Sequence, residues 1–252
     1  MIMDKFSLKG KVAVVTGANT GLGQGMCVAL AQAGAKVAGV ARRSCEETKA
    51  LIEKDGGEFL EVIADLGSTE PIQGIIDKTV EKFGKVDILV NNAGIILRED
   101  AINVPEADWD KVITINQKVV FFMCQAFAKE FEKIGGGKIV NVASMLSYQG
   151  GIRVPAYTAS KSAILGLTRA LANEWASKNI NVNAIAPGYM ATNNTAQLRD
   201  DADRSEAILD RIPAGRWGTP EDMEGAVVYL ASKASDYVNG FTLAVDGGWL
   251  AR

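Results

Sequence analysis

The sequence predicts an α/β fold in which a doubly wound, seven-stranded parallel sheet carries helices on both faces. Three features predict it: short apolar or β-branched runs, helical patterns between them, and a glycine-rich turn after the first run. The runs are residues 11–16, 36–41, 59–64, 87–91, 138–142, 181–185 and 241–245. Because βαβ crossovers are right-handed, strands that alternate with helices form parallel sheets buried on both faces. We therefore expect a Rossmann-like architecture.

The segments between these runs carry apolar residues at three- and four-residue spacing, as in Met26, Leu30 and Ala33, which predicts crossover helices. No stretch resembles a linker, so residues 1–252 are predicted to form a single domain. The polar stretch at about 187–218 is the one long interval that breaks the alternation. Since it lies near the carboxyl ends of the strands, we expect a lid over the substrate, the alternative being a solvated helical excursion.

Composition narrows the classes of function. The net charge is −3 and the 27 Lys and Arg residues are spread along the chain, so neither nucleic acid nor a membrane is an expected partner. The amino-terminal residues lack a long apolar run, and we expect a cytoplasmic protein. Cys27, Cys45 and Cys124 show no CxxC spacing, and the chain has no histidine. These features argue against disulfides, a metal site and any histidine-based catalysis.

The turn after the first run has the composition of a phosphate-binding loop. Gly17, Gly21 and Gly23 lie between that run and a helical pattern. Glycines at such a position permit a tight turn, let the backbone approach a pyrophosphate and let the helix pack on the strand. The free N–H groups of the helix would face the phosphates. We therefore predict a dinucleotide site, although the spacing G-x-x-x-G-x-G differs from the G-x-G-x-x-G pattern.

The end of the second run bears on the choice between the two nicotinamide dinucleotides. An acidic residue there would hold a ribose 2′-hydroxyl, but the chain has Ala41, Arg42 and Arg43. Two guanidinium groups suit a 2′-phosphate, so NADP is the predicted cofactor and NAD the alternative. If Arg42 and Arg43 are only solvated surface charges, the choice between NADP and NAD stays open.

A phenol and an ammonium occur four residues apart, at Tyr157 and Lys161, within a helical pattern. Residues at this spacing share one helix face. A nearby cation favours the phenolate, so we expect Lys161, together with the positive nicotinamide ring of the oxidised cofactor, to lower the pKa of Tyr157 for acid/base work. Ser144 follows the fifth run, at the sheet edge where such folds bind ligands, and could hold a substrate oxygen.

The order of these motifs is similar to that of the short-chain dehydrogenases/reductases over essentially the whole chain. The shared motifs are Thr16-Gly17-x-x-x-Gly21-x-Gly23, Asn91-Asn92-Ala93-Gly94, Asn116, Ser144, Tyr157-x-x-x-Lys161 and Pro187-Gly188. The resemblance implies hydride transfer between a nicotinamide and a secondary alcohol or ketone. In it, Tyr157 moves the proton, Ser144 positions the substrate oxygen and Lys161 holds the nicotinamide ribose. Asn116 would be the fourth catalytic residue; it would lie in a long helix and hold a water molecule with its backbone carbonyl.

The resemblance also implies how the cofactor is held. Asp65 looks like the adenine contact, the residues from Asn92 to Gly94 like the wall beside the ribose, and the residues from Pro187 to Met190 like the cover of the nicotinamide. The predicted cofactor contacts are Gly17, Asn19, Thr20, Gly21, Leu22, Gly23, Arg42, Arg43, Asp65, Leu66, Asn92, Ala93, Gly94, Tyr157, Lys161, Pro187, Gly188, Met190 and Thr192.

Four longer stretches resemble the deoxygluconate dehydrogenases, a group within this family. They are residues 143–155, 187–195, 212–218 and 246–252. The resemblance implies a six-carbon sugar acid as substrate, in the breakdown of pectin-type polysaccharides. A sugar acid needs a cation for its carboxylate and hydrogen-bonding groups for its hydroxyls. Besides Ser144 and Tyr157 we therefore predict Gln149, Arg153 and Arg98 as substrate contacts, the alternative for either arginine being a surface or interface ion pair.

The resemblance further implies a homotetramer formed through the helices that contain Asn116 and Tyr157, with Trp249 and Leu250 suited to a subunit contact. Two other functions remain alternatives. A 3-ketoacyl thioester reductase of the same fold would need an apolar acyl channel, which the polar stretch 147–153 disfavours. A non-catalytic NADP-binding regulator would leave Ser144, Tyr157 and Lys161 unexplained.

Overall fold

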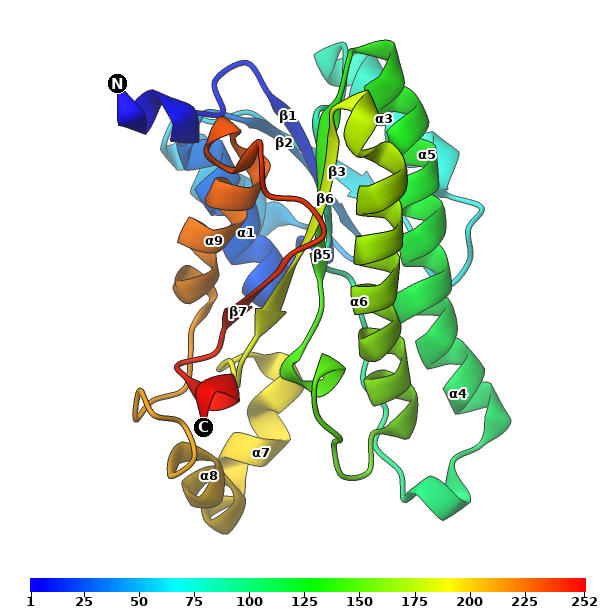
Figure 1. The fold of residues 1–252 in the computed structure, drawn as a ribbon, viewed down its shortest axis with the longest axis vertical. Coiled ribbons are helices and arrows are strands. Elements are labelled where there is room, and N and C mark those ends of the chain that lie inside the picture. Colours follow the sequence, from blue (N-terminus) through cyan, green and yellow to red (C-terminus); the bar gives the residue numbers. More distant parts are fainter.

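The computed structural model describes residues 1–252 and contains a seven-stranded sheet, all parallel, in the strand order β3-β2-β1-β4-β5-β6-β7 (Figure 1). The strands are β1 (Val12–Thr16), β2 (Lys36–Ala41), β3 (Phe59–Ile63), β4 (Ile88–Asn91), β5 (Gly137–Val142), β6 (Ile180–Pro187) and β7 (Thr242–Val245). Each predicted run coincides with one of these strands apart from small differences at the ends. The predicted fold class is confirmed.

Helices cover both faces of the sheet. In Figure 1, α1 and α9 lie on one side, and α3, α5 and α6 lie on the other. The helices are α1 (Gly21–Gln32), α2 (Glu46–Lys54), α3 (Ile72–Phe83), α4 (Glu106–Ile113), α5 (Val119–Lys133), α6 (Pro155–Trp175), α7 (Ala196–Asp200), α8 (Ala202–Leu209) and α9 (Glu224–Ala231). No helix combines the length and the apolar character that crossing a lipid bilayer requires.

The apolar strands explain why two helical layers form. All five residues of β1 are buried, and alternate side chains point to opposite faces of the sheet. Ala13 and Val15 belong to the apolar cluster under α1 and α9, whereas Val14 belongs to the cluster under α3, α5 and α6. A strand that is apolar on both faces is stable only if helices exclude water from each.

The strand order reverses beside β1, which pairs with β2 on one side and β4 on the other. The chain therefore leaves the sheet in opposite directions after these strands, and a crevice opens at their carboxyl ends. The carboxyl end of β1 is Thr16, and that of β4 is Asn91. The topology thus selects this edge for the glycine loop and for the residues that follow β4 and β5.

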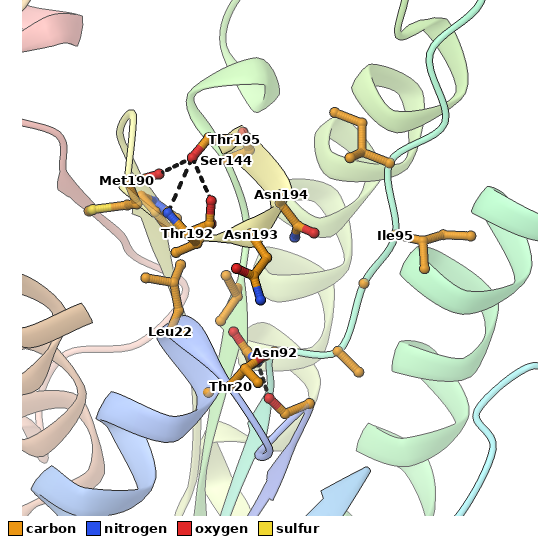
Figure 2. Close-up of a pocket in the computed structure, with 18 of the residues that line it drawn as sticks. Thr20, Leu22, Asn92, Ile95, Ser144, Met190, Thr192, Asn193, Asn194 and Thr195 are labelled. Atoms are coloured by element: carbon orange, nitrogen blue, oxygen red, sulfur yellow. Dashed lines mark hydrogen bonds between the residues drawn. The ribbon is translucent and has the colours of Figure 1, made fainter. Parts of the chain in front are cut away.

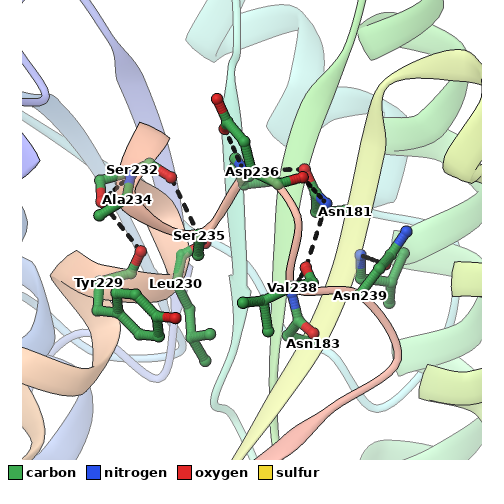
Figure 3. A network of polar contacts seen from close by, with 12 residues as sticks. Asn181, Asn183, Tyr229, Leu230, Ser232, Ala234, Ser235, Asp236, Val238 and Asn239 are labelled. Atoms are coloured by element: carbon green, nitrogen blue, oxygen red, sulfur yellow. Dashed lines mark hydrogen bonds and ion pairs between the residues drawn. The ribbon is translucent and has the colours of Figure 1, made fainter. Parts of the chain in front are cut away.

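Asparagine side chains fasten the connection between α9 and β7 to strand β6 (Figure 3). The Asn181 amide donates to the carbonyls of Asp236 and Val238, and buried Asn183 donates to Val238 and accepts from the Phe241 N–H at 3.0 Å. These bonds satisfy backbone groups before regular pairing of β6 with β7 begins at Ala184. They fix where β7 and the carboxyl-terminal segment leave the sheet.

The segment after β6 forms an excursion that is pinned at its base. Met190 and Gly218 form a parallel bridge, in which the Ala191 N–H donates to the Gly218 carbonyl at 2.7 Å. Between these two points the chain makes a short helical turn, Asn193–Thr195, followed by α7 and α8. The polar stretch that breaks the strand–helix alternation is therefore a mostly helical excursion at the carboxyl edge of the sheet.

Candidate active site

The glycine loop is shaped by close approaches that only glycine permits. Gly17 and Gly21 have φ of +68° and +57°, a region disfavoured for other residues. A Cβ on Gly23 would lie 2.0 Å from the Gly17 carbonyl oxygen, so helix α1 and strand β1 could not approach as they do. The N-cap of α1, Thr20, makes no side-chain cap bond. The first N–H groups and the positive end of the helix dipole thus remain available to an anion in the crevice.

A clamp between the ends of β1 and β4 holds this loop. The Thr16 hydroxyl accepts hydrogen bonds from the N–H groups of Asn92 at 3.0 Å and Ala93 at 2.9 Å. In return, the Asn92 amide donates to the Thr16 carbonyl at 2.9 Å. The side chain of Asn92 is therefore used to brace the glycine loop, while its backbone continues into the wall of the cleft.

Two adjoining hollows follow the carboxyl edge of the sheet. One, of about 300 Å³, lies between the glycine loop and the group Ser144, Tyr157 and Lys161. The other, of about 330 Å³, lies beside Arg42 and Arg43. They share the loop residues Gly17, Asn19 and Thr20 as well as Ala93 and Gly94, and so form one cleft. Every residue predicted to contact the cofactor lines one of the two hollows.

The second hollow presents two cations without protein partners. Arg42 and Arg43 are exposed, and neither guanidinium forms a salt bridge. The nearby carboxylate of Glu61 is occupied by the Ser44 hydroxyl, at 2.9 Å, and by the Cys45 N–H. Two unpaired guanidinium groups at the end of β2 suit the 2′-phosphate of NADP. Together with the narrow glycine loop, they fit a phosphorylated dinucleotide.

Ser144, Tyr157 and Lys161 meet in the first hollow. Ser144 caps a short turn after β5, and its Oγ accepts from the Leu146 N–H at 3.1 Å, which leaves the hydroxyl proton free to donate. Tyr157 lies near the start of α6, which begins with Pro155. The Lys161 Nζ lies 5.7 Å from the centroid of the Tyr157 ring and donates to the Val142 carbonyl at 2.6 Å.

Burial dominates the electrostatics of this group. It raises the pKa of Tyr157 above 10, while the Ser144 hydroxyl and the charge of Arg98 act to lower it. Burial also lowers the pKa of Lys161 to about 8, because the residue is only 5% exposed and its ammonium has no carboxylate partner. The expectation that Lys161 and the positive nicotinamide ring together lower the pKa of Tyr157 concerns the protein with oxidised cofactor bound, and it stays a prediction. In the protein alone, desolvation outweighs the cations, and Arg98 is the cation that opposes it.

Asn116 lies in a π-helical turn, Thr114–Lys118, that joins α4 to α5. Its fully buried side chain accepts from the Ile95 N–H and donates to the Ile95 carbonyl, both at 2.9 Å. It also donates to the Ser160 hydroxyl at 3.2 Å. Asn116 thus ties the cleft wall that follows β4 to helix α6, next to Lys161. The wide turn, rather than a regular long helix, brings it there.

The three further substrate candidates separate in the structure. Arg98 lines the first hollow, makes no ion pair, and donates to the Asn194 carbonyl at 3.1 Å. Gln149 and Arg153 lie outside the cleft lining. Gln149 accepts from the Trp249 indole, and Arg153 pairs with Asp100 at 2.9 Å on the surface. Arg153 thus forms the surface ion pair given as its alternative, and neither Gln149 nor Arg153 lines the hollow that holds Ser144 and Tyr157.

The turn Thr192–Thr195 supplies residues that sequence reasoning missed. Asn193, Asn194 and Thr195 line the first hollow, and Figure 2 shows Asn193 reaching from this turn toward Thr20 and Asn92. The Thr195 hydroxyl donates to the Met190 carbonyl at 2.6 Å and holds the turn over the start of α1. The spacing Thr-x-x-Thr after Pro187-Gly188 is a capping signal that could have located the turn.

Comparison with known proteins agrees with this geometry. A family model described as enoyl-(acyl carrier protein) reductase matches residues 17–250. The glycine loop, the clamp after β4 and the Ser144, Tyr157, Lys161 group define a nicotinamide-dependent oxidoreductase, and this chain belongs to the short-chain dehydrogenase/reductase family.

The chain is 63% identical to the 2-dehydro-3-deoxy-D-gluconate 5-dehydrogenase of Dickeya dadantii, with 100% of both chains covered. It is 56% identical to an Agrobacterium tumefaciens protein whose crystal structure has bound NADP, with a TM-score of 0.94 and 99% and 100% of the two chains covered. It is 36% identical to a gluconate 5-dehydrogenase from Burkholderia cenocepacia, solved with NADP and tartrate, with a TM-score of 0.94 and both chains fully covered.

The buried ammonium of Lys161 is predicted to lower the free energy of unfolding. The pKa of Lys161 is about 8 in the folded protein and 10.5 in the unfolded chain, so between these pH values the unfolded chain holds the proton more strongly. The destabilisation by Lys161 is therefore largest below pH 8 and disappears as the pH rises through 10.5. Lys161→Met should therefore raise the free energy of unfolding by about 1–3 kcal/mol at pH 7, and by less at pH 10. Urea unfolding at both pH values measures this.

The matched control is Lys129→Met, which removes an exposed lysine from α5 and should leave the unfolding free energy within about 0.5 kcal/mol at either pH. A Lys161→Met protein that is less stable than the wild type at pH 7, or equally shifted at both pH values, would contradict the proposed cost of the buried charge.

Proposed function

We propose that this chain is an NADP-dependent dehydrogenase of a six-carbon sugar acid, of the 2-dehydro-3-deoxy-D-gluconate 5-dehydrogenase type. The observation that carries the proposal is the first hollow, where Ser144, Tyr157 and Lys161 face an unpaired guanidinium, Arg98. Full-length identity of 63% to an enzyme of that name supports the substrate class. The type that oxidises 2-deoxy-D-gluconate at C3 is the nearest variant of the same activity.

The proposed chemistry assigns one task to each side chain. Bound NADP supplies a hydride acceptor or donor. The Ser144 hydroxyl donates to the substrate oxygen, and the Tyr157 oxygen takes the hydroxyl proton in oxidation or returns it in reduction. The buried Lys161 holds a positive charge next to the phenol and offers its remaining N–H groups to a ribose. Asn116 and the Thr16–Asn92 clamp keep these groups in register.

Arg98 is the proposed anchor for the substrate carboxylate. It is partly buried at the cleft, holds no protein carboxylate, and lies close enough to Tyr157 for its charge to lower the pKa of the phenol. A planar guanidinium binds a carboxylate through two parallel hydrogen bonds, which would orient the sugar acid toward Tyr157. Asn193 and Asn194 line the same hollow from the covering turn and supply amides for hydroxyl groups.

We propose further that residues 1–252 act as one catalytic domain in which the excursion at 187–218 serves as a lid. The turn at Thr192–Thr195 supports this, since it lies over α1 and bonds to Arg98 through the Asn194 carbonyl.

Exposed Trp109 on α4 and Phe122 on α5 suit a contact between subunits of a homotetramer. Three free buried thiols suit the cytoplasm, and the substrate class suits pectin breakdown.

A panel of substrates tests the function directly. Purified protein is mixed with NADPH or NADH and with sugar acids oxidised at C5 or C3, or with 3-ketoacyl thioesters, and absorbance at 340 nm is followed. We expect turnover of the C5 sugar acids, with an apparent KM for NADPH at least tenfold below that for NADH. Turnover of thioesters alone would replace the proposed substrate, and NADP binding without any turnover would favour a regulator.

Arg98 can be tested by substitution. Arg98→Ala should raise KM for the sugar acid at least tenfold, equivalent to about 1.4 kcal/mol, because the carboxylate loses its partner. In the oxidation direction, where the Tyr157 phenolate accepts the proton, it should also move the rise of kcat with pH to higher pH, since Arg98 lowers the pKa of Tyr157. Arg153→Ala is the matched control and should change neither, because Arg153 pairs with Asp100 outside the cleft. Equal effects of the two substitutions would remove Arg98 from the substrate site.

A further inference from the structure

Trp249, near the carboxyl end of the chain, lies between the loop after β5 and the excursion after β6. It is only 4% exposed within its own chain, so burial of its side chain needs no subunit contact, in contrast to the sequence expectation. It forms an apolar cluster with Met145, which follows Ser144, and with Ile208 and Ile212 of the lid excursion. One side chain therefore contacts both the loop that carries Ser144 and the segment that covers the cleft.

Directional contacts fix the indole on each side. On the Ser144 side, its Nε1 donates to the Gln149 Oε1 at 3.1 Å. On the lid side, its ring lies 4.8 Å from the Tyr189 ring at an edge-on angle, and the Arg211 guanidinium stacks 4.2 Å from its centroid. A hydrogen bond and a cation–π contact hold a ring in one orientation more tightly than apolar packing does.

The turn that presents Trp249 is itself well defined. The Asp246 carboxylate accepts from the N–H groups of Gly248 and Leu250, both at 2.9 Å. Gly247 and Gly248 have φ of +64° and +91°, and the Gly247 carbonyl accepts from the Ala214 N–H at 3.0 Å. Because the turn is tied to β7 on one side and to the lid excursion on the other, displacement of the indole would disturb both.

We propose that Trp249 is a positioning residue for catalysis, whose indole holds the Ser144 loop through Gln149 and the lid through Tyr189 and Arg211. This inference rests on the proposed function for its kinetic readout. Trp249 touches no reacting atom. Its effect is to hold the Ser144 hydroxyl in place relative to the lid that covers the cleft. Loss of the indole should therefore change substrate binding and turnover, and leave the dinucleotide half of the cleft unchanged.

The test compares Trp249→Phe, which keeps an aromatic ring but removes the N–H donor, with Gln149→Leu, which removes the acceptor, and with the double variant. Each single change should raise KM for the sugar acid about three- to tenfold, as expected for one lost hydrogen bond. The double variant should match either single one, because both remove the same bond. The Kd for NADPH, measured by quenching of protein fluorescence, should stay within twofold.

Trp217→Phe is the matched control, because Trp217 packs edge-on against Tyr189 at 5.5 Å but makes no bond to the Ser144 loop. It should leave KM unchanged. Hydrogen exchange gives a readout that needs no substrate: amides at 145–149 should exchange faster in Trp249→Phe and not in Trp217→Phe. If the wild-type protein does not turn over sugar acids, the proposed function alone is overturned. The role of Trp249 is overturned if Trp249→Phe leaves exchange at 145–149 unchanged, if the effects of the single variants on KM add in the double variant, or if Trp217→Phe has an equal effect.

Discussion

The candidate site depends on one buried cation that no carboxylate neutralises. The ammonium of Lys161 is held only by the Val142 carbonyl and faces the cleft beside Tyr157. Such a charge disfavours folding, so the surrounding structure must hold it in place. The Asn116 amide joins the cleft wall to Ser160, the residue before Lys161 in the chain, and the Ser147 hydroxyl donates to the Lys161 carbonyl at 2.6 Å. The same burial that costs stability preserves the strength of the charge near the phenol.

A second constraint comes from the close approach of β1, β4 and α1 at the point where the strand order reverses. At Gly17 and Gly23 the glycine loop leaves no space for a Cβ, and the clamp between Thr16 and Asn92 fixes where β4 ends. From this fixed edge, β4 and β5 lead into the two walls that carry Arg98 and Ser144. The phosphate-binding and proton-transfer halves of the cleft are therefore parts of one rigid frame, and the covering turn at Thr192–Thr195 spans them.

Features that depend on local pattern could be predicted from the sequence, while features that depend on long-range contacts could not. The strands, the glycine loop and the helix-borne pair Tyr157 and Lys161 follow from periodicity and spacing. The ion pair of Arg153 with Asp100 and the bond of Gln149 to Trp249, a hundred residues away in sequence, do not. The direction of the Tyr157 pKa shift also depends on burial, which spacing does not reveal. Asn193 was missed because its place in the cleft depends on how the excursion after β6 folds back.

The most direct measurement of the central claim is turnover of Tyr157→Phe with saturating sugar acid and NADP, beside its affinity for NADPH. If the Tyr157 phenol carries the proton, kcat should fall about 10³-fold or more while the Kd for NADPH stays within twofold. Tyr148→Phe, which removes a phenol from an exposed side chain outside the cleft, should keep wild-type turnover. Turnover of Tyr157→Phe within tenfold of the wild type would contradict the account.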